Sequence, residues 1–87
     1  VVASSAQATT ADDYLAQAKA LLGKKGSEQE VIRLANQSLE GRQSAEAYIY
    51  RAYAKGDFGD KQGAIADYNQ ALAINPQVAT AATPRLP

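Results

Sequence analysis

The segment from Ala45 to Pro76 constrains the fold most, because small and bulky side chains recur along it at helical spacing. It predicts two amphipathic helices that are joined by a turn rich in glycine and aspartate. Asn75-Pro76 should end the second helix, since a residue before proline is pushed out of helical geometry. Alanine stands where the two helices would touch, with a tyrosine one turn away: Ala52, Ala64 and Ala71, beside Tyr48 and Tyr68. The segment therefore predicts a closely packed helical hairpin.

This segment resembles one tetratricopeptide repeat, a helix–turn–helix unit of about 34 residues. The matching positions are a small residue in the first helix, the turn glycine, the small–aromatic–small ladder and the final proline: Ala52, Gly59, Ala64, Tyr68, Ala71 and Pro76. One position departs from the family, because Lys55 stands at the first helix's second aromatic position. The resemblance implies an all-α fold, in which two antiparallel helix–turn–helix hairpins stack into a short right-handed superhelical segment.

The first half of the chain carries a weaker copy of the same pattern. Moving the second half back by about 34 residues places Tyr48 on Tyr14 and Ala52 on Ala18. The predicted organisation is a leader, a degenerate first repeat, a second repeat and a tail, over residues 1–9, 10–43, 44–77 and 78–87. A short capping helix within residues 77–83 is one possibility for the tail, because Pro84 and Pro87 would stop a longer one.

Capping residues and glycines set the predicted helix ends. Thr10 with Asp13, and Ser27 with Glu30, have the spacing of reciprocal capping boxes at the first two helices. Glycines should end these helices, at Gly23, Gly26 and Gly41. The third and fourth helices should be capped by Ser44 and Asp60 and separated by a turn at 56–59.

The apolar spacing also predicts which side chains face inward. In the second helix the predicted buried residues are Val31, Leu34, Ala35, Ser38 and Leu39. In the fourth helix they are Ile65, Tyr68, Ala71 and Leu72, with Ile74 closing the end. Phe58 is expected to tuck into the second hairpin.

Composition removes several classes of function. The chain has no cysteine and no histidine, which excludes disulfides, thiol nucleophiles, the usual zinc sites and histidine-based catalysis. Nine basic and nine acidic residues cancel, so no net field favours nucleic acid or an anionic membrane. No apolar run approaches the roughly 20 residues of a membrane span. We therefore expect no cofactor and no enzymatic activity.

Three local motifs have plainer explanations than ligand binding. Residues 23–27, GKKGS, lack the spacing and the preceding strand of a phosphate-binding loop. Asp57 and Asp60 lack the other ligands of a calcium loop and are better explained by turn formation. Asn36-Gln37-Ser38 is a glycosylation sequon, but it falls inside a predicted helix with Ser38 facing the core.

In the tetratricopeptide family the first helix of each hairpin lines a concave surface that grips peptides. The resemblance implies such a surface here, apolar and aromatic, with two charged residues at its edge. The implied partner-binding residues are Leu15, Lys19, Leu22, Glu46, Ile49, Tyr50 and Tyr53. The alternative is that some of them only pack against neighbouring helices. The carboxylate clamp of chaperone-binding members is not expected, because Ala16 and Tyr50 stand at its asparagine positions.

Two functions follow as hypotheses. The first is a protein–protein interaction module, such as an adaptor, assembly factor or accessory subunit that binds a polypeptide. The second is a structural subunit that completes its core by homo-oligomerisation, because an independent array usually needs about three repeats.

The start of the chain leaves the compartment open. Ala6-Gln7-Ala8 has the small–x–small pattern that precedes signal-peptidase sites. The sequence of the second repeat resembles that of bacterial, especially cyanobacterial, tetratricopeptide proteins. Taken together, these two features indicate the periplasm or the thylakoid lumen. The other interpretation is a flexible leader on a cytoplasmic protein.

Overall fold

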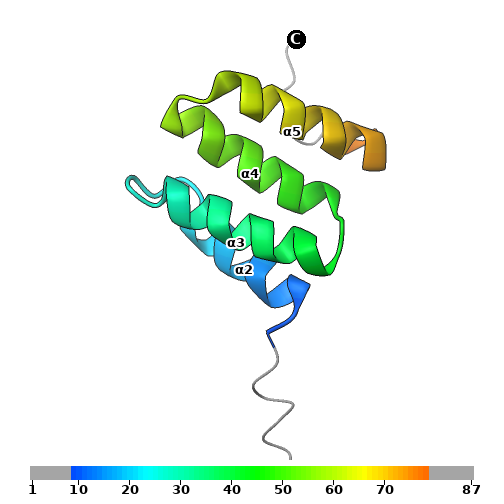
Figure 1. Cartoon of the computed structure of the whole chain (residues 1–87), viewed down its shortest axis with the longest axis horizontal. Helices are drawn as coiled ribbons and strands as arrows, with labels where there is room; N and C mark the ends of the chain where they lie inside the picture. The colour runs from blue at the N-terminus through cyan, green and yellow to red at the C-terminus, as the bar shows by residue number, and fades with distance from the viewer. Residues whose placement is uncertain (1–8, 79–87) are drawn as a thin grey trace, which may run out of the picture.

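The computed structural model describes residues 9–78, which form four helices and no strand. These are α2 (Ala11–Leu21), α3 (Glu28–Gly41), α4 (Ala45–Phe58) and α5 (Lys61–Ile74). Each helix packs on the next one in the chain, and α2 also touches α4 (Figure 1). The connections are short, so successive helices run in alternating directions. The expected all-α fold is confirmed, and its pairing is sequential. The predictions for residues 1–8 and 79–87 lie outside the described residues.

Side-chain caps define the start of three of the four helices. Thr10 and Asp13 form the predicted reciprocal box on α2, with N···O distances of 3.0 and 3.1 Å. The Ser44 hydroxyl accepts from the backbone of Ala47 at α4, and Asp60 accepts from Gly63 at α5. These bonds satisfy backbone donors that a helix start leaves without partners.

The predicted box at α3 is wrong. Ser27 precedes this helix, but its side chain makes no capping hydrogen bond. Its ψ of 6° differs from the extended backbone that a capping serine usually adopts. Ser27 is held by its backbone alone: its N–H donates to the carbonyl of Lys24, and its carbonyl accepts from the N–H of Val31.

The α4–α5 turn is shorter than predicted, because α4 continues to Phe58. Gly59 has a φ of 107°, the left-handed conformation that glycine adopts without strain. The N–H groups of Gly59 and Asp60 donate to the carbonyls of Gly56 and Lys55, which is the Schellman pattern of helix ends. Phe58 is 58% exposed at this last turn, so the prediction that it tucks into the hairpin is wrong.

The core consists of the inner face of α3 and of alanine side chains from the other helices. All five residues predicted to face inward from α3 are buried: Val31, Leu34, Ala35, Ser38 and Leu39. Ala18 and Ala54 complete a buried cluster with Val31 and Leu34. The three predicted contact alanines are also buried: Ala52, Ala64 and Ala71. Their small side chains allow the close approach of α4 and α5.

The predicted inner face of α5 is wrong in part. Ala71 is fully buried and Tyr68 is partly buried, but Ile65, Leu72 and Ile74 are exposed. Instead, the face of α5 toward α4 is formed by Ala64, Asp67 and Ala71. Within residues 9–78, α5 packs mainly on α4, so most of its circumference has no neighbour to bury it.

Buried Ser38 connects the first two helices. Its hydroxyl donates a 2.9 Å hydrogen bond to the carbonyl of Ala11, at the start of α2. The ends of α2 and α3 come close here, because a Cβ placed on Gly41 would lie 3.1 Å from the Cβ of Ala11. Glycine at the end of α3 therefore allows this approach, and the helix ends there as predicted.

Candidate functional site

Two adjoining hollows lie along α4. The first has a volume of about 490 Å³ and is lined by Glu46, Ile49, Tyr50, Tyr53, Asn75, Gln77 and Val78. The second has about 410 Å³ and is lined by Asp12, Leu15, Ala16, Lys19, Arg42, Glu46 and Tyr50. Glu46 and Tyr50 line both, so the hollows adjoin on α4, one toward α2 and the other toward the segment after α5. We call the two hollows together the α2–α4 groove.

The groove contains six of the seven residues that the sequence singled out: Leu15, Lys19, Glu46, Ile49, Tyr50 and Tyr53. Leu22 is the exception. It packs against the buried cluster of α2, α3 and α4 and lines a separate recess with Val31 and Ala54. The sequence did not predict the wall formed by Asn75, Gln77 and Val78. This segment comes after the last predicted helix, and its apolar residues have no regular spacing.

The two tyrosines of the groove differ in how firmly they are held. Tyr50 is partly buried against the core, and Tyr53 is 45% exposed. The Tyr53 ring meets the ring of Tyr68 edge-on, with centroids 6.4 Å apart. Such pairs fix ring orientation and are favourable beyond the area they bury. Tyr53 therefore offers an oriented aromatic surface on a helix.

Both Tyr50 and Tyr68 remain protonated near neutral pH. Burial, and after it the negative charge of Glu46, raise the pKa of the Tyr50 phenol above its ordinary value. Burial also raises the pKa of Tyr68, with smaller effects of Tyr53 and Asp57. The Tyr50 hydroxyl can thus donate a hydrogen bond in the groove.

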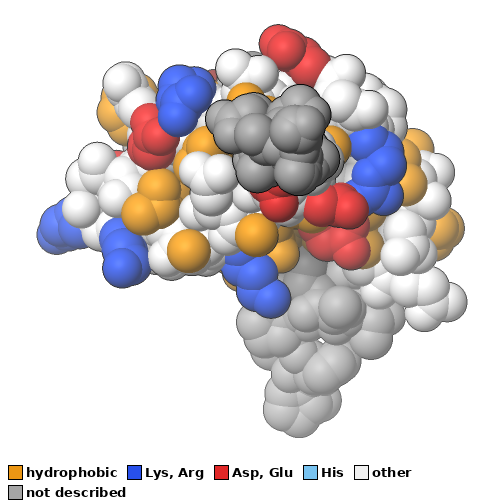
Figure 2. Space-filling view, turned by 90° about the horizontal axis from the view of Figure 1, so that it is seen from below, with side chains coloured by type: hydrophobic (Ala, Val, Ile, Leu, Met, Phe, Trp, Pro, Cys, Tyr) orange, Lys and Arg blue, Asp and Glu red, His pale blue; other side chains and the backbone are white. Residues whose placement is uncertain are grey.

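The charges of the groove are few and of both signs. Asp12, in the first turn of α2, and Arg42, the residue that follows α3, form an ion pair with each other. Glu46 and Lys19 are exposed and form no ion pair within residues 9–78. Figure 2 shows one face of the molecule, on which acidic and basic side chains are interspersed rather than gathered by sign.

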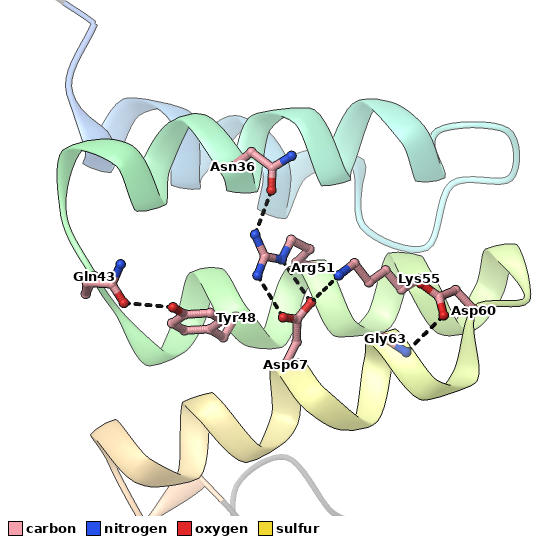
Figure 3. Close-up of polar contacts among 8 residues, drawn as sticks. All are labelled: Asn36, Gln43, Tyr48, Arg51, Lys55, Asp60, Gly63 and Asp67. Atoms are coloured by element: carbon pink, nitrogen blue, oxygen red, sulfur yellow. Dashed lines mark hydrogen bonds and ion pairs between the residues drawn. The ribbon is translucent and has the colours of Figure 1, made fainter.

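A polar cluster of residues outside the lining of the groove is centred on Arg51 (Figure 3). From α4, its guanidinium donates to both carboxylate oxygens of Asp67 in α5, at 2.9 and 2.8 Å. It also donates to Asn36 in α3 at 2.7 Å and lies 5.3 Å from the centre of the Tyr48 ring. Lys55 adds an ion pair to Asp67 at 3.1 Å. Arg51 thereby connects three consecutive helices.

Asp67 is 3% exposed, so its charge depends on these partners. Burial alone would raise the pKa of the Asp67 carboxyl, but hydrogen bonds from Arg51 and Lys55 outweigh burial and lower it below the ordinary value. The bond with Asp67 in turn raises the pKa of Arg51. Within residues 9–78 no buried side-chain nitrogen or oxygen lacks a hydrogen-bond partner, so this cluster stabilises the packing of α3, α4 and α5.

Sequence reasoning missed this cluster, although one signal was present. Asp67 stands three and four residues from two alanines of the packed face, Ala64 and Ala71. A carboxylate on a buried helix face requires a cationic partner. Arg51 and Lys55, four residues apart on the preceding helix, were the available candidates.

Residues 9–78 show neither a cluster of three or more side chains suited to a metal ion nor a helix long and apolar enough to cross a membrane. No protein-family model, curated protein or solved structure matches the chain. What is established is an all-α domain of four sequentially paired helices.

Proposed function

We propose that this chain is a protein–protein interaction module of the tetratricopeptide type, which binds an extended segment of a partner polypeptide in the α2–α4 groove. In this view α2–α3 and α4–α5 are the two stacked hairpins, and α2 and α4 are the helices that face the ligand. The module is an adaptor, assembly factor or accessory subunit and carries out no catalysis itself.

One observation carries the proposal: two hollows that share Glu46 and Tyr50 are lined by side chains of α2 and α4, which are not consecutive in the chain. Leu15 comes from α2, and Ile49 and Tyr53 come from α4, yet they line adjoining hollows. Aromatic and aliphatic side chains held on helices are good anchors for a partner, because little conformational entropy is lost when they are covered.

The experiment that tests the proposal is site-specific photo-crosslinking in a native extract. A benzophenone amino acid replaces Ile49 in the groove, and in a control protein it replaces Gln29, an exposed residue of α3. We expect Ile49 to crosslink a defined partner segment that Gln29 does not. Tyr53→Ala should lower the yield about tenfold or more, as truncation of an aromatic anchor does. Equal labelling from both positions, or none from Ile49, would contradict the proposal.

A second candidate function is self-association through α5. The exposed Ile65 and Leu72, 59% and 37% accessible, lie one helix turn to either side of Tyr68. The chain has no net charge, so two copies would not repel each other at long range. Sedimentation equilibrium of the full chain should then show a dimer that Ile65→Glu dissociates. A monomer at high concentration would exclude this candidate and leave the first untouched.

A further inference from the structure

One acidic residue lines both hollows of the α2–α4 groove. Glu46 stands in the first turn of α4, is exposed and lines both hollows. It has no ion-pair partner within residues 9–78. A ligand that lies along the groove must therefore pass next to this negative charge.

None of the neighbouring charged residues within residues 9–78 forms an ion pair with Glu46. Arg42 lines the second hollow with Glu46, but it is paired with Asp12. Among the described residues that line the groove, Lys19 on α2 is the remaining charged one. The groove thus favours a cationic group at its middle, and an anionic group only toward Lys19.

The side chains around Glu46 suit a guanidinium in particular. Tyr50 lines both hollows beside it, and Tyr53 lines the first. Arginine combines bidentate pairing to a carboxylate with stacking on an aromatic ring, which lysine does less well. The protein already uses this combination, since Arg51 pairs with Asp67 and lies over the ring of Tyr48.

We infer that the groove selects an extended peptide segment in which arginine, or less favourably lysine, adjoins a bulky apolar residue. The cation pairs with Glu46 between the hollows, and the apolar side chain enters the hollow lined by Ile49, Tyr53 and Val78. This inference rests on the proposed function and adds the chemistry of the partner segment to it.

Selection from a library of random dodecapeptides tests the inference with the full chain as bait. The peptides that bind are synthesised with a fluorophore, and their affinities are measured by fluorescence anisotropy. We expect arginine beside leucine, isoleucine or an aromatic residue to be enriched. Glu46→Gln should lower the affinity for these peptides about tenfold, because a charge-assisted pair is lost. Replacing the peptide arginine with citrulline should lower the affinity by the same factor. The two changes together should lower it no further than either one alone.

Control variants separate this inference from the proposed function. Glu40→Gln alters an exposed glutamate of α3 outside the groove and should leave affinity unchanged. Glu46→Lys should reverse the preference toward acidic peptides. Peptides that lose binding with Tyr53→Ala but not with Glu46→Gln, or that lack a basic residue, overturn the inference and leave the groove standing. If no peptide from the library loses affinity with Tyr53→Ala, both this inference and the proposed function are overturned.

Discussion

At the residue scale, Gly63 and Asp60 constrain each other at the start of α5. Asp60 accepts from the backbone N–H of Gly63 at 2.9 Å, and a Cβ added to Gly63 would lie 2.2 Å from a carboxylate oxygen of Asp60. A side chain at position 63 therefore displaces the cap. At Gly56 in α4 an added Cβ would meet only Ala64, at an ordinary 3.9 Å.

This difference predicts opposite outcomes for two glycine-to-alanine changes. Gly56→Ala should raise the free energy of unfolding by about 0.5–1 kcal/mol, since alanine favours the helix. Gly63→Ala should give no gain, because loss of a cap worth about 1 kcal/mol offsets the same preference. In an Asp60→Ala background Gly63→Ala should become stabilising. Urea denaturation measures all four variants, and an equal gain from both single changes would refute the account of the cap.

Asp67 gives the stability of the fold a dependence on pH. Its pKa in the folded protein is lowered, so its ion pairs contribute fully above the unfolded value of about 3.9. That contribution is lost as the pH falls through the lowered folded value. We expect Asp67→Asn to destabilise the protein by about 3 kcal/mol at about pH 7, since it leaves Arg51 with a poorer partner, and by about 1 kcal/mol less at about pH 3.

Urea denaturation at the two pH values provides the measurement, and Glu30→Gln is the matched control. Glu30 also forms an ion pair, with Arg33, but both side chains are largely exposed. Exposed pairs of this kind contribute little to stability. A penalty for Asp67→Asn that does not shrink in acid would show that its charge is not what holds α4 and α5 together.

At the scale of elements, α3 and α5 show where sequence reasoning succeeds and where it fails. α3 is covered by α2 on one side and α4 on another, so its apolar stripe and its buried face coincide. Within residues 9–78, α5 packs mainly on α4. The residues of α5 that are buried there are two alanines and the ion-paired Asp67. Apolar spacing identified Ile65 and Leu72 as inward, because spacing alone does not show which side has a neighbour.

The same comparison yields a prediction for adjacent residues of α5. Ala71 is fully buried, whereas Leu72 is 37% exposed. Ala71→Leu should overpack the α4–α5 contact and lower the free energy of unfolding by about 1–3 kcal/mol. Leu72→Ala should cost less than about 1 kcal/mol, well below the 2–5 kcal/mol of a core leucine. Thermal unfolding distinguishes the two, and the reverse order would mean that the predicted face is the buried one.

At the scale of the whole molecule, the groove exists only because α2 and α4 come together across α3. The residues of its two helices were named from the resemblance to a repeat family, which supplies the relation between hairpins that a single helix cannot. Leu22 was misplaced because α2 ends at Leu21, so Leu22 does not continue the helical spacing of Leu15 and Lys19. The sequence could not show that Glu46 lines both hollows and has no ion-pair partner within residues 9–78, because pairing depends on side chains from other helices.

The most direct test of the central claim is an amide chemical-shift map of the full chain as a groove-selected peptide is added. We predict that the shifts concentrate on the lining of α2 and α4, including Leu15, Ile49 and Tyr53, and spare the exposed side of α3 around Glu40. Shifts confined to α3 or to the outer face of α5, with Ile49 and Tyr53 unmoved, would contradict it.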